Sequence, residues 1–301
     1  MSRLKIGMIG LDTSHVVAFT ELLNDARHPY HVPGGQVVAA FPGGSPDFEL
    51  SASRVEGFTA KLRDEFGVSI VDSPEAVAEA SDAVLLESVD GRVHLEQFRR
   101  IVSYGKPVFI DKPLAVRSDE ANEIYRLAEQ HGVPVMSSSA LRYAEALTAA
   151  VADDSLGGVI GADVFGPMAI QPTQPGLFWY GIHMADMLFT VLGGDCVEVS
   201  ATTTEQHDVV VGTWADGRIG TIRGNRSGNN KFAASLHREQ GSVFVDVSTH
   251  PKPYYASLLE RIMEMFTTGV PPIRPEETLR LIRFLEAANE SRETAGRLVR
   301  L

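Results

Sequence analysis

The chain has 301 residues, of which 44% are hydrophobic and 22% are charged, so it can form one large domain or two smaller ones. Its 27 basic and 39 acidic residues give a formal charge of −12, which argues against a nucleic-acid partner. We find neither a secretory leader nor an apolar stretch of about 18 residues, and we therefore expect a cytoplasmic protein without a membrane partner. Cys196 is the only cysteine, which excludes an intramolecular disulfide and favours a packing role for this residue.

Residues 1–140 alternate apolar runs of strand length with amphipathic segments of helix length. This alternation predicts a doubly wound parallel sheet that helices cover on both faces. The expected strands are 5–9, 36–41, 69–71, 83–86, 108–110 and 133–136, and the clearest helices are 59–66, 74–80, 93–104 and 119–130.

Beyond residue 140 the pattern changes. Helices over 143–152 and 178–192 flank a strand at 159–165, and further strands then follow one another with only turns between them. Residues 141–301 are therefore expected to form a second, α+β domain for substrate binding and oligomerisation, built on an open, mainly antiparallel sheet. Its other strands are expected at 197–204, 209–214, 218–223, 231–237 and 242–247, and its last helices at 254–268 and 275–292. One face of such a sheet is commonly covered by another subunit, so we expect a homodimer or homotetramer.

The stretch KIGMIGLDTSH, residues 5–15, is a short strand followed by Gly10, a polar turn and a helix that begins near His15. Dinucleotide-binding βα turns begin in this way, because backbone N–H groups and the helix dipole favour a pyrophosphate, and Thr13 and Ser14 add hydroxyl donors. Asp12 and His15 occupy two glycine positions of the G-x-G-x-x-G pattern. The Asp12 carboxylate either caps the helix or lies near the phosphates and weakens binding by repulsion.

A second departure follows the strand at 36–41. The sequence FPGGSP, residues 41–46, has no acidic residue where the dinucleotide pattern places one for the adenosine ribose.

The stretch FIDKPLAV, residues 109–116, ends a strand in Asp111-Lys112-Pro113. Lys112 is thereby expected at the carboxyl edge of the parallel sheet, where ligands of doubly wound folds bind. The chain here resembles the family of glucose-fructose oxidoreductase, inositol dehydrogenase and rhizopine-catabolism (Gfo/Idh/MocA) proteins, whose hallmark is Glu-Lys-Pro. The similarity extends to ESVDGRVH at 87–94, which matches a family Thr-Pro-x-x-x-His segment in His94, to LRY at 141–143, and to the C-terminal sequence from 275.

The resemblance implies a Rossmann-type first domain that binds NAD or NADP, and a lysine that touches both the nicotinamide and the substrate hydroxyl. The cofactor-binding residues that it implies are Gly10, Asp12, Thr13, Ser14, His15, Ser88, Asp90, His94, Asp111, Lys112 and Arg142.

A third family motif, Asp-x-Gly-x-His-x-x-Asp, aligns with WYGIHMAD at 179–186, where Trp179 replaces the first Asp. His183 and Asp186, three residues apart on a helix, share a face, so Asp186 could orient His183 or stabilise its charge as a general base. Tyr180 can supply a further hydroxyl. The expected catalytic residues are thus Lys112, His183, Tyr180 and Asp186.

Together these features predict an NAD(P)-dependent oxidoreductase that transfers a hydride between nicotinamide and a hydroxyl-bearing carbon of a small polar molecule such as a sugar or cyclitol. His183 would accept the hydroxyl proton and Lys112 would stabilise the alkoxide. Two alternatives remain open: a non-catalytic ligand sensor, and a lyase or isomerase that holds its cofactor tightly. We expect no metal, because no spacing rule requires the Asp12–His15 and His183–Asp186 pairs to meet in one site.

Overall fold

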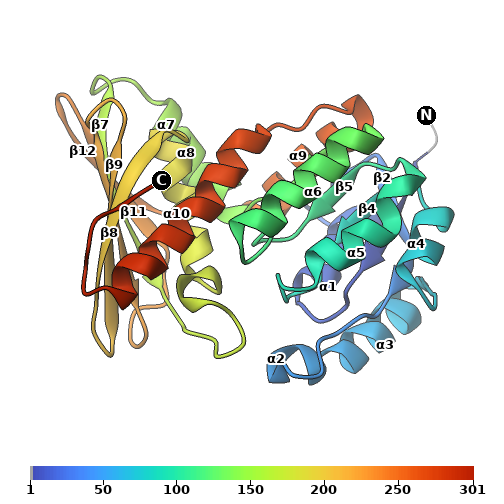
Figure 1. Cartoon of the computed structure of the whole chain (residues 1–301). Helices are drawn as coiled ribbons and strands as arrows, with labels where there is room; N and C mark the ends of the chain where they lie inside the picture. The colour runs from blue at the N-terminus through green and yellow to red at the C-terminus, as the bar shows by residue number, and fades with distance from the viewer. Residues whose placement is uncertain (1–2) are drawn as a thin grey trace. The chain divides into compact units, whose positions relative to one another are not determined.

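The computed structural model describes residues 3–301 and contains two compact units (Figure 1). The first unit consists of the N-terminal residues up to 115, residues 119–138 and residues 255–274. The second unit consists of residues 116–118, 139–254 and 275–301. Each unit is built on one sheet, and together they confirm the predicted fold class.

The sheet of the first unit has six parallel strands in the order β3-β2-β1-β4-β5-β6. Apart from Leu4 and Lys5 at the start of β1, its central strands are apolar and buried, as burial on both faces requires. Successive strands are added on one side of β1 up to β3 and on its other side from β4 onward. Doubly wound sheets bind their ligands at this switch point between β1 and β4. The strands are β1 (Leu4–Ile9), β2 (Gly35–Phe41), β3 (Ser69–Ile70), β4 (Ala83–Leu86), β5 (Val108–Ile110) and β6 (Val135–Met136).

The helices of this unit follow the predicted order with shifted ends. Residues 93–104 form a helix followed by a 3-10 turn, and a short helix precedes the predicted helix at 59–66, which itself begins four residues earlier. The helices are α1 (His15–Asn24), α2 (Glu49–Ala52), α3 (Val55–Phe66), α4 (Pro74–Ala80), α5 (His94–Ile101), α6 (Ser118–His131) and α9 (Tyr254–Thr268), with the 3-10 turn η1 (Val102–Tyr104).

Helix α9 belongs to the first unit from Tyr255 onward, whereas the sequence analysis placed it in the second domain. The ring of Tyr255 lies 4.9 Å from that of His15 and 5.7 Å from that of Phe19, between ring centroids. Leu259 and Ile262 are completely buried. The amphipathic pattern of α9 was visible in the sequence, but the pattern does not identify the sheet that its apolar face covers.

The sheet of the second unit has seven strands in the order β12-β11-β7-β10-β9-β8-β13. Only β7 and β10 pair in parallel, and the remaining neighbours are antiparallel, as predicted. The strands are β7 (Val159–Pro167), β8 (Cys196–Thr203), β9 (His207–Trp214), β10 (Ile219–Asn225), β11 (Ala233–Arg238), β12 (Gly241–Asp246) and β13 (Val299–Arg300).

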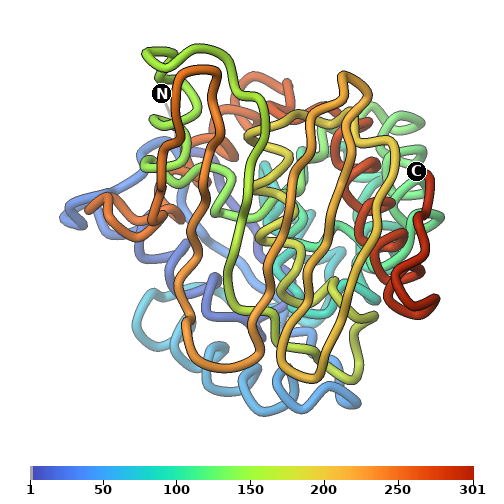
Figure 2. The backbone as a smooth tube through the Cα atoms, turned by 90° about the vertical axis from the view of Figure 1, so that its left-hand side faces the viewer, coloured from blue at the N-terminus to red at the C-terminus, as the bar shows by residue number. Residues whose placement is uncertain are grey.

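The helices of the second unit lie on one face of this sheet, and the other face, toward the viewer in Figure 2, has no helix of this unit over it. Val164, Ile222 and Leu236 point to the helix-covered face and are buried, whereas Phe244 is 66% exposed. The helices are α7 (Glu145–Ala152), α8 (Gly181–Leu192) and α10 (Pro275–Glu293), and 3-10 turns, η2 (Ala140–Tyr143) and η3 (Gly176–Phe178), replace the predicted first turns of α7 and α8.

Within residues 3–301, no helix combines the length and the apolar character that a membrane span needs. Cys196 is buried at the start of β8, in agreement with a packing role.

Candidate functional site

The turn after β1 has the geometry of an anion site. Gly10 adopts a positive φ of 86°, and a Cβ at this position would lie 2.4 Å from the backbone nitrogen of Ser88, so only glycine fits. Helix α1 begins directly after the turn with neither a side-chain cap nor an acidic residue in its first turn. Its N-terminal N–H groups, with Thr13 and Ser14 beside them, suit the pyrophosphate of a dinucleotide.

The Asp12 carboxylate does not cap this helix, so that interpretation is wrong. Asp12 is completely buried and accepts hydrogen bonds from the Ser51 hydroxyl at 2.6 Å and from the Val89 backbone N–H at 2.9 Å. It thus connects the turn to α2 and to the segment after β4. Burial, which outweighs these two hydrogen bonds, raises the pKa of Asp12.

The adenosine ribose of a dinucleotide would lie beyond the end of β2. The first acid after β2 is Asp47, and both of its oxygens accept hydrogen bonds from the Arg92 guanidinium at 2.9 Å. Arg92 also binds Asp90, which the resemblance had placed at the cofactor. The turn therefore fits the phosphates of NAD, while Asp47, the first carboxylate that follows β2, is engaged in an ion pair with Arg92.

Lys112 follows β5 at the carboxyl edge of the sheet and is 8% exposed. The segment around it is held by His94, which is completely buried. The His94 ring nitrogens lie 2.7 Å from the Ser88 carbonyl oxygen and 3.0 Å from the Pro113 carbonyl oxygen. His94 thereby ties the loop after β4 to the segment after β5, and it positions Lys112.

A buried group of ionisable side chains lies at the same edge. His15 Nδ1 is 3.0 Å from Asp111 Oδ2 and 3.8 Å from Glu87 Oε2. Burial, and then the charge of Asp111, raise the pKa of Glu87 well above its ordinary value. Burial acts in the same direction on Asp111, but the charges of His15 and Lys112 outweigh it and lower the pKa of Asp111.

Glu87 was not among the residues that the sequence analysis selected. The signal for it was its position directly after β4, because β1, β4 and β5 are neighbours and the residues that follow them must converge.

In the second unit, Ser139 contacts both residues of the predicted acid–base pair. Its hydroxyl lies 2.7 Å from His183 Nδ1, and its backbone N–H donates to Asp186 Oδ2 at 2.6 Å. Ser139 thus bridges His183 and Asp186, and the orientation of His183 by Asp186 itself stays a prediction. Ser139 lies 44 residues before His183 in the chain, so no local motif could have revealed it.

Arg142 was predicted to bind the cofactor, and the structure gives its guanidinium two carboxylate partners. It donates to Asp186 at 2.7 Å and lies 2.7 Å from Glu277. These two carboxylates raise the pKa of Arg142 despite its burial. Burial raises the pKa of Asp186, with Arg142 opposing it.

Aromatic rings surround His183. The ring of Tyr180 lies 5.7 Å and that of Phe232 lies 5.5 Å from the imidazole, centroid to centroid. Trp179, which replaces the family carboxylate, packs against Tyr180 at 6.0 Å. The imidazole of His183 is therefore bordered by aromatic rings.

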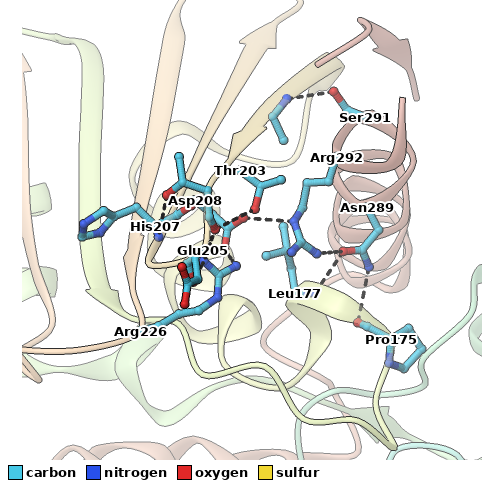
Figure 3. Close-up of polar contacts among 12 residues, drawn as sticks. Pro175, Leu177, Thr203, Glu205, His207, Asp208, Arg226, Asn289, Ser291 and Arg292 are labelled. Atoms are coloured by element: carbon cyan, nitrogen blue, oxygen red, sulfur yellow. Dashed lines mark hydrogen bonds and ion pairs between the residues drawn. The ribbon is translucent and has the colours of Figure 1, made fainter. Parts of the chain in front are cut away.

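The segment that leads to Trp179 is fixed by the C-terminal part of α10 (Figure 3). Asn289 accepts a hydrogen bond from the Leu177 N–H at 3.0 Å and donates one to the Pro175 carbonyl oxygen at 3.3 Å. One turn further along, Arg292 donates to the buried Asp208 at 3.0 Å. The Asn289 contacts anchor this segment to α10, and the Arg292 contact anchors α10 to β9.

Comparisons with known proteins agree with this geometry. Residues 4–139 match the model of the oxidoreductase family with an NAD-binding Rossmann fold (GFO_IDH_MocA). The chain is 27% identical over 207 residues to 1,5-anhydro-D-fructose reductase of Ensifer adhaerens, an alignment that covers 63% of this chain and 59% of the relative. The chain thus spans less than two thirds of the length of that relative.

Solved structures share the fold over the whole chain. A probable dehydrogenase from Thermotoga maritima superposes with a TM-score of 0.81 at 19% identity, covering 99% of both chains. GenD2 from gentamicin A biosynthesis, in complex with NAD, gives 0.79 at 18% identity, covering 100% of this chain and 97% of its own. Myo-inositol dehydrogenase from Lactobacillus casei, in complex with NAD(H) and myo-inositol, gives 0.77 at 16% identity, with the same coverage.

The parallel sheet, the glycine turn and the match of residues 4–139 to the family model identify the first unit as a Rossmann domain of the NAD-binding type. Residues 4–139 are thus similar to the Gfo/Idh/MocA family, whose model they match.

Proposed function

We propose that the protein oxidises or reduces a hydroxyl-bearing carbon of a small polar molecule, a sugar or a cyclitol, with NAD or NADP as the redox partner. The observation that carries this proposal is the contact of the Ser139 hydroxyl with His183 Nδ1, because it fixes an imidazole beside a ring-lined surface as an oriented base. Two of the compared proteins, an anhydrofructose reductase and a myo-inositol dehydrogenase, are named for substrates of this kind.

Each group of the protein has a separate role in this reaction. The bound nicotinamide supplies the hydride chemistry. The turn at Gly10 and the N-terminus of α1 hold its phosphates. His183 takes the hydroxyl proton during oxidation and returns it during reduction, and Ser139 keeps its ring in position. Lys112 stabilises the negative charge that develops on the substrate oxygen, and the Tyr180 hydroxyl orients the substrate.

The test is a steady-state assay with NAD⁺ and NADP⁺ over a panel of sugars and cyclitols. Lys112→Ala should lower kcat/KM about 100-fold, as the loss of an oxyanion-type donor does. Lys106→Ala, a lysine six residues earlier, serves as the matched control and should keep the wild-type rate. Turnover that is equal in both variants would refute the role of Lys112. Cofactor binding without turnover of any compound would instead favour a ligand sensor.

We further propose that the uncovered face of the second sheet pairs with the same face of a second copy in a homodimer or homotetramer. Phe244 on β12 is 66% exposed and stacks with Phe165 on β7 at 6.0 Å, and Ile219 on β10 is 53% exposed. A face of this apolar character supports self-association. Light scattering should report an oligomer for the wild type and a smaller species for Phe244→Asp, and a monomeric wild type would contradict the proposal.

We propose a cytoplasmic location as well. The single buried thiol of Cys196 and a soluble dinucleotide partner both suit a reducing compartment. Fractionation of cells that produce the protein would test this location.

A further inference from the structure

His15, Glu87 and Asp111 bring three metal-ligating atoms together in the first unit. One side-chain nitrogen or oxygen from each residue lies within 4.8 Å of the other two. The three residues come from the start of α1 and from the positions directly after β4 and β5, which are adjacent elements of one rigid sheet edge. The arrangement therefore depends on regular secondary structure and not on a loop.

Glu87 is the residue that this environment leaves without a hydrogen bond. It is completely buried, and neither of its carboxylate oxygens has a hydrogen-bond partner among residues 3–301. His15 Nδ1 and Asp111 Oδ2 face each other at 3.0 Å, but neither atom meets hydrogen-bond geometry. Buried polar atoms of this kind cost free energy unless a ligand, an ion or water satisfies them.

The distances between these atoms suit one small cation. Zinc binds imidazole nitrogen and carboxylate oxygen at about 2.0–2.2 Å, so two ligand atoms of a tetrahedral site lie about 3.3 Å apart. The measured separations from His15 Nδ1, 3.0 Å to Asp111 and 3.8 Å to Glu87, bracket that value.

The charges and the access route agree with such a site. Metal ligation requires a neutral imidazole and ionised carboxylates, so in the metal-bound state the two carboxylates would face the cation and Lys112, which lies beside Asp111 in the sequence. The His15 side chain is 11% exposed, whereas that of Glu87 is fully buried, so an ion would enter past the imidazole.

We propose that His15, Glu87 and Asp111 form a binding site for one divalent transition-metal ion, of the Zn²⁺ or Mn²⁺ class. A mixed set of one imidazole and two carboxylates selects these ions over Mg²⁺, which prefers oxygen ligands and retains its water. Three protein ligands leave at least one coordination position for water or a ligand.

The experiment uses the full chain, stripped of metal with a chelator and titrated with Zn²⁺ alone and with Mn²⁺ alone, without dinucleotide or substrate. Saturable binding of one ion per chain is expected, read by calorimetry for Zn²⁺ and by loss of the free Mn²⁺ electron-paramagnetic-resonance signal for Mn²⁺. Glu87→Gln preserves the shape of the side chain and removes its charge, and it should weaken binding at least about 100-fold, since loss of an outer-shell partner alone costs 10- to 100-fold.

Asp163→Asn is the matched control. Asp163 pairs with His237 at 2.7 Å in the second unit, so this change also removes a carboxylate from a histidine, but away from the proposed ligands. Binding should be unchanged in this variant. If Glu87→Gln melts at a much lower temperature than the wild type, His15→Gln replaces it in the comparison. Absence of saturable binding of both ions by the wild type, or equal affinity in the ligand variants, overturns the proposal.

Discussion

The hydroxyl oxygen of Ser139 lies 2.7 Å from Nδ1 of His183. Ser139→Ala removes this contact but keeps the backbone N–H that binds Asp186. We expect kcat to fall about 2- to 10-fold, the equivalent of one neutral hydrogen bond, with little change in KM and with a shift of the acidic limb of the pH–rate profile.

Ser138→Ala is the control for this prediction. Ser138 is also buried, and its hydroxyl has no hydrogen-bond partner within the described part of the chain. The control should leave the pH profile unchanged, and a profile that moves equally in both variants would assign the effect to packing.

The Asp12 carboxylate predicts a distinctive pH dependence of stability. Burial raises its pKa in the folded state, so folding favours the protonated form. That contribution is complete below the unfolded pKa of about 4 and is lost as the pH rises through the higher folded value. Asp12→Asn cannot ionise, so urea unfolding from pH 4 to pH 7 should show its stability improving relative to the wild type.

Asp25→Asn should give the opposite slope when the same series is extended down to pH 2. Hydrogen bonds from the backbone and side chain of Arg27 lower the pKa of the exposed Asp25, so its carboxylate stabilises the fold above its unfolded pKa and that stabilisation is lost at lower pH. Parallel slopes for the two variants would contradict the assignment for Asp12.

Asp208 should be the most costly carboxylate to neutralise in the network of Figure 3. It is completely buried and binds the guanidinium groups of Arg226 and Arg292. Asp208→Asn leaves both cations without a counter-charge, and we expect a loss of roughly 3 kcal/mol in the free energy of unfolding. Asp216→Asn, which removes the exposed partner of Arg218, should change stability little. Chemical denaturation of the two variants makes the comparison.

Cys196 should resist thiol reagents in the folded protein. Burial raises the pKa of its thiol to about 11, so only about one molecule in a thousand carries the reactive thiolate at pH 8. A chromogenic disulfide should therefore react slowly with the native protein and quickly in denaturant. Fast reaction of the native protein would show that the start of β8 opens readily.

The sequence predicted those parts of the site that follow from local backbone geometry. The strand before Gly10, the strand before Lys112 and the helical spacing of His183 and Asp186 all lie in continuous patterns, and the structure has each of them. The helix ends were less exact, because 3-10 turns precede α7 and α8 where the sequence pattern continues.

The partners of these residues were beyond the reach of local patterns. Asp12 binds Val89, 77 residues away, and His183 meets a serine 44 residues away. Glu87 and Asp111 become neighbours only because the strand order is β1-β4-β5. The sequence pattern is compatible with several other orders of the same strands. A residue pattern gives the chemistry of each side chain, but the topology of the sheet decides which side chains lie together in one site.

The return of α9 to the first unit means that neither unit is encoded by one continuous stretch of chain. A fragment that ends at residue 140 would lack the Tyr255 ring that packs on His15 and Phe19, and it would expose the apolar surface that Leu259 and Ile262 cover. A chimera made by one crossover near residue 140 would therefore combine the parallel sheet of one relative with the α9 helix of the other. Inheritance of the two units should be linked, with changes around His15 accompanied by changes in a helix more than 200 residues away.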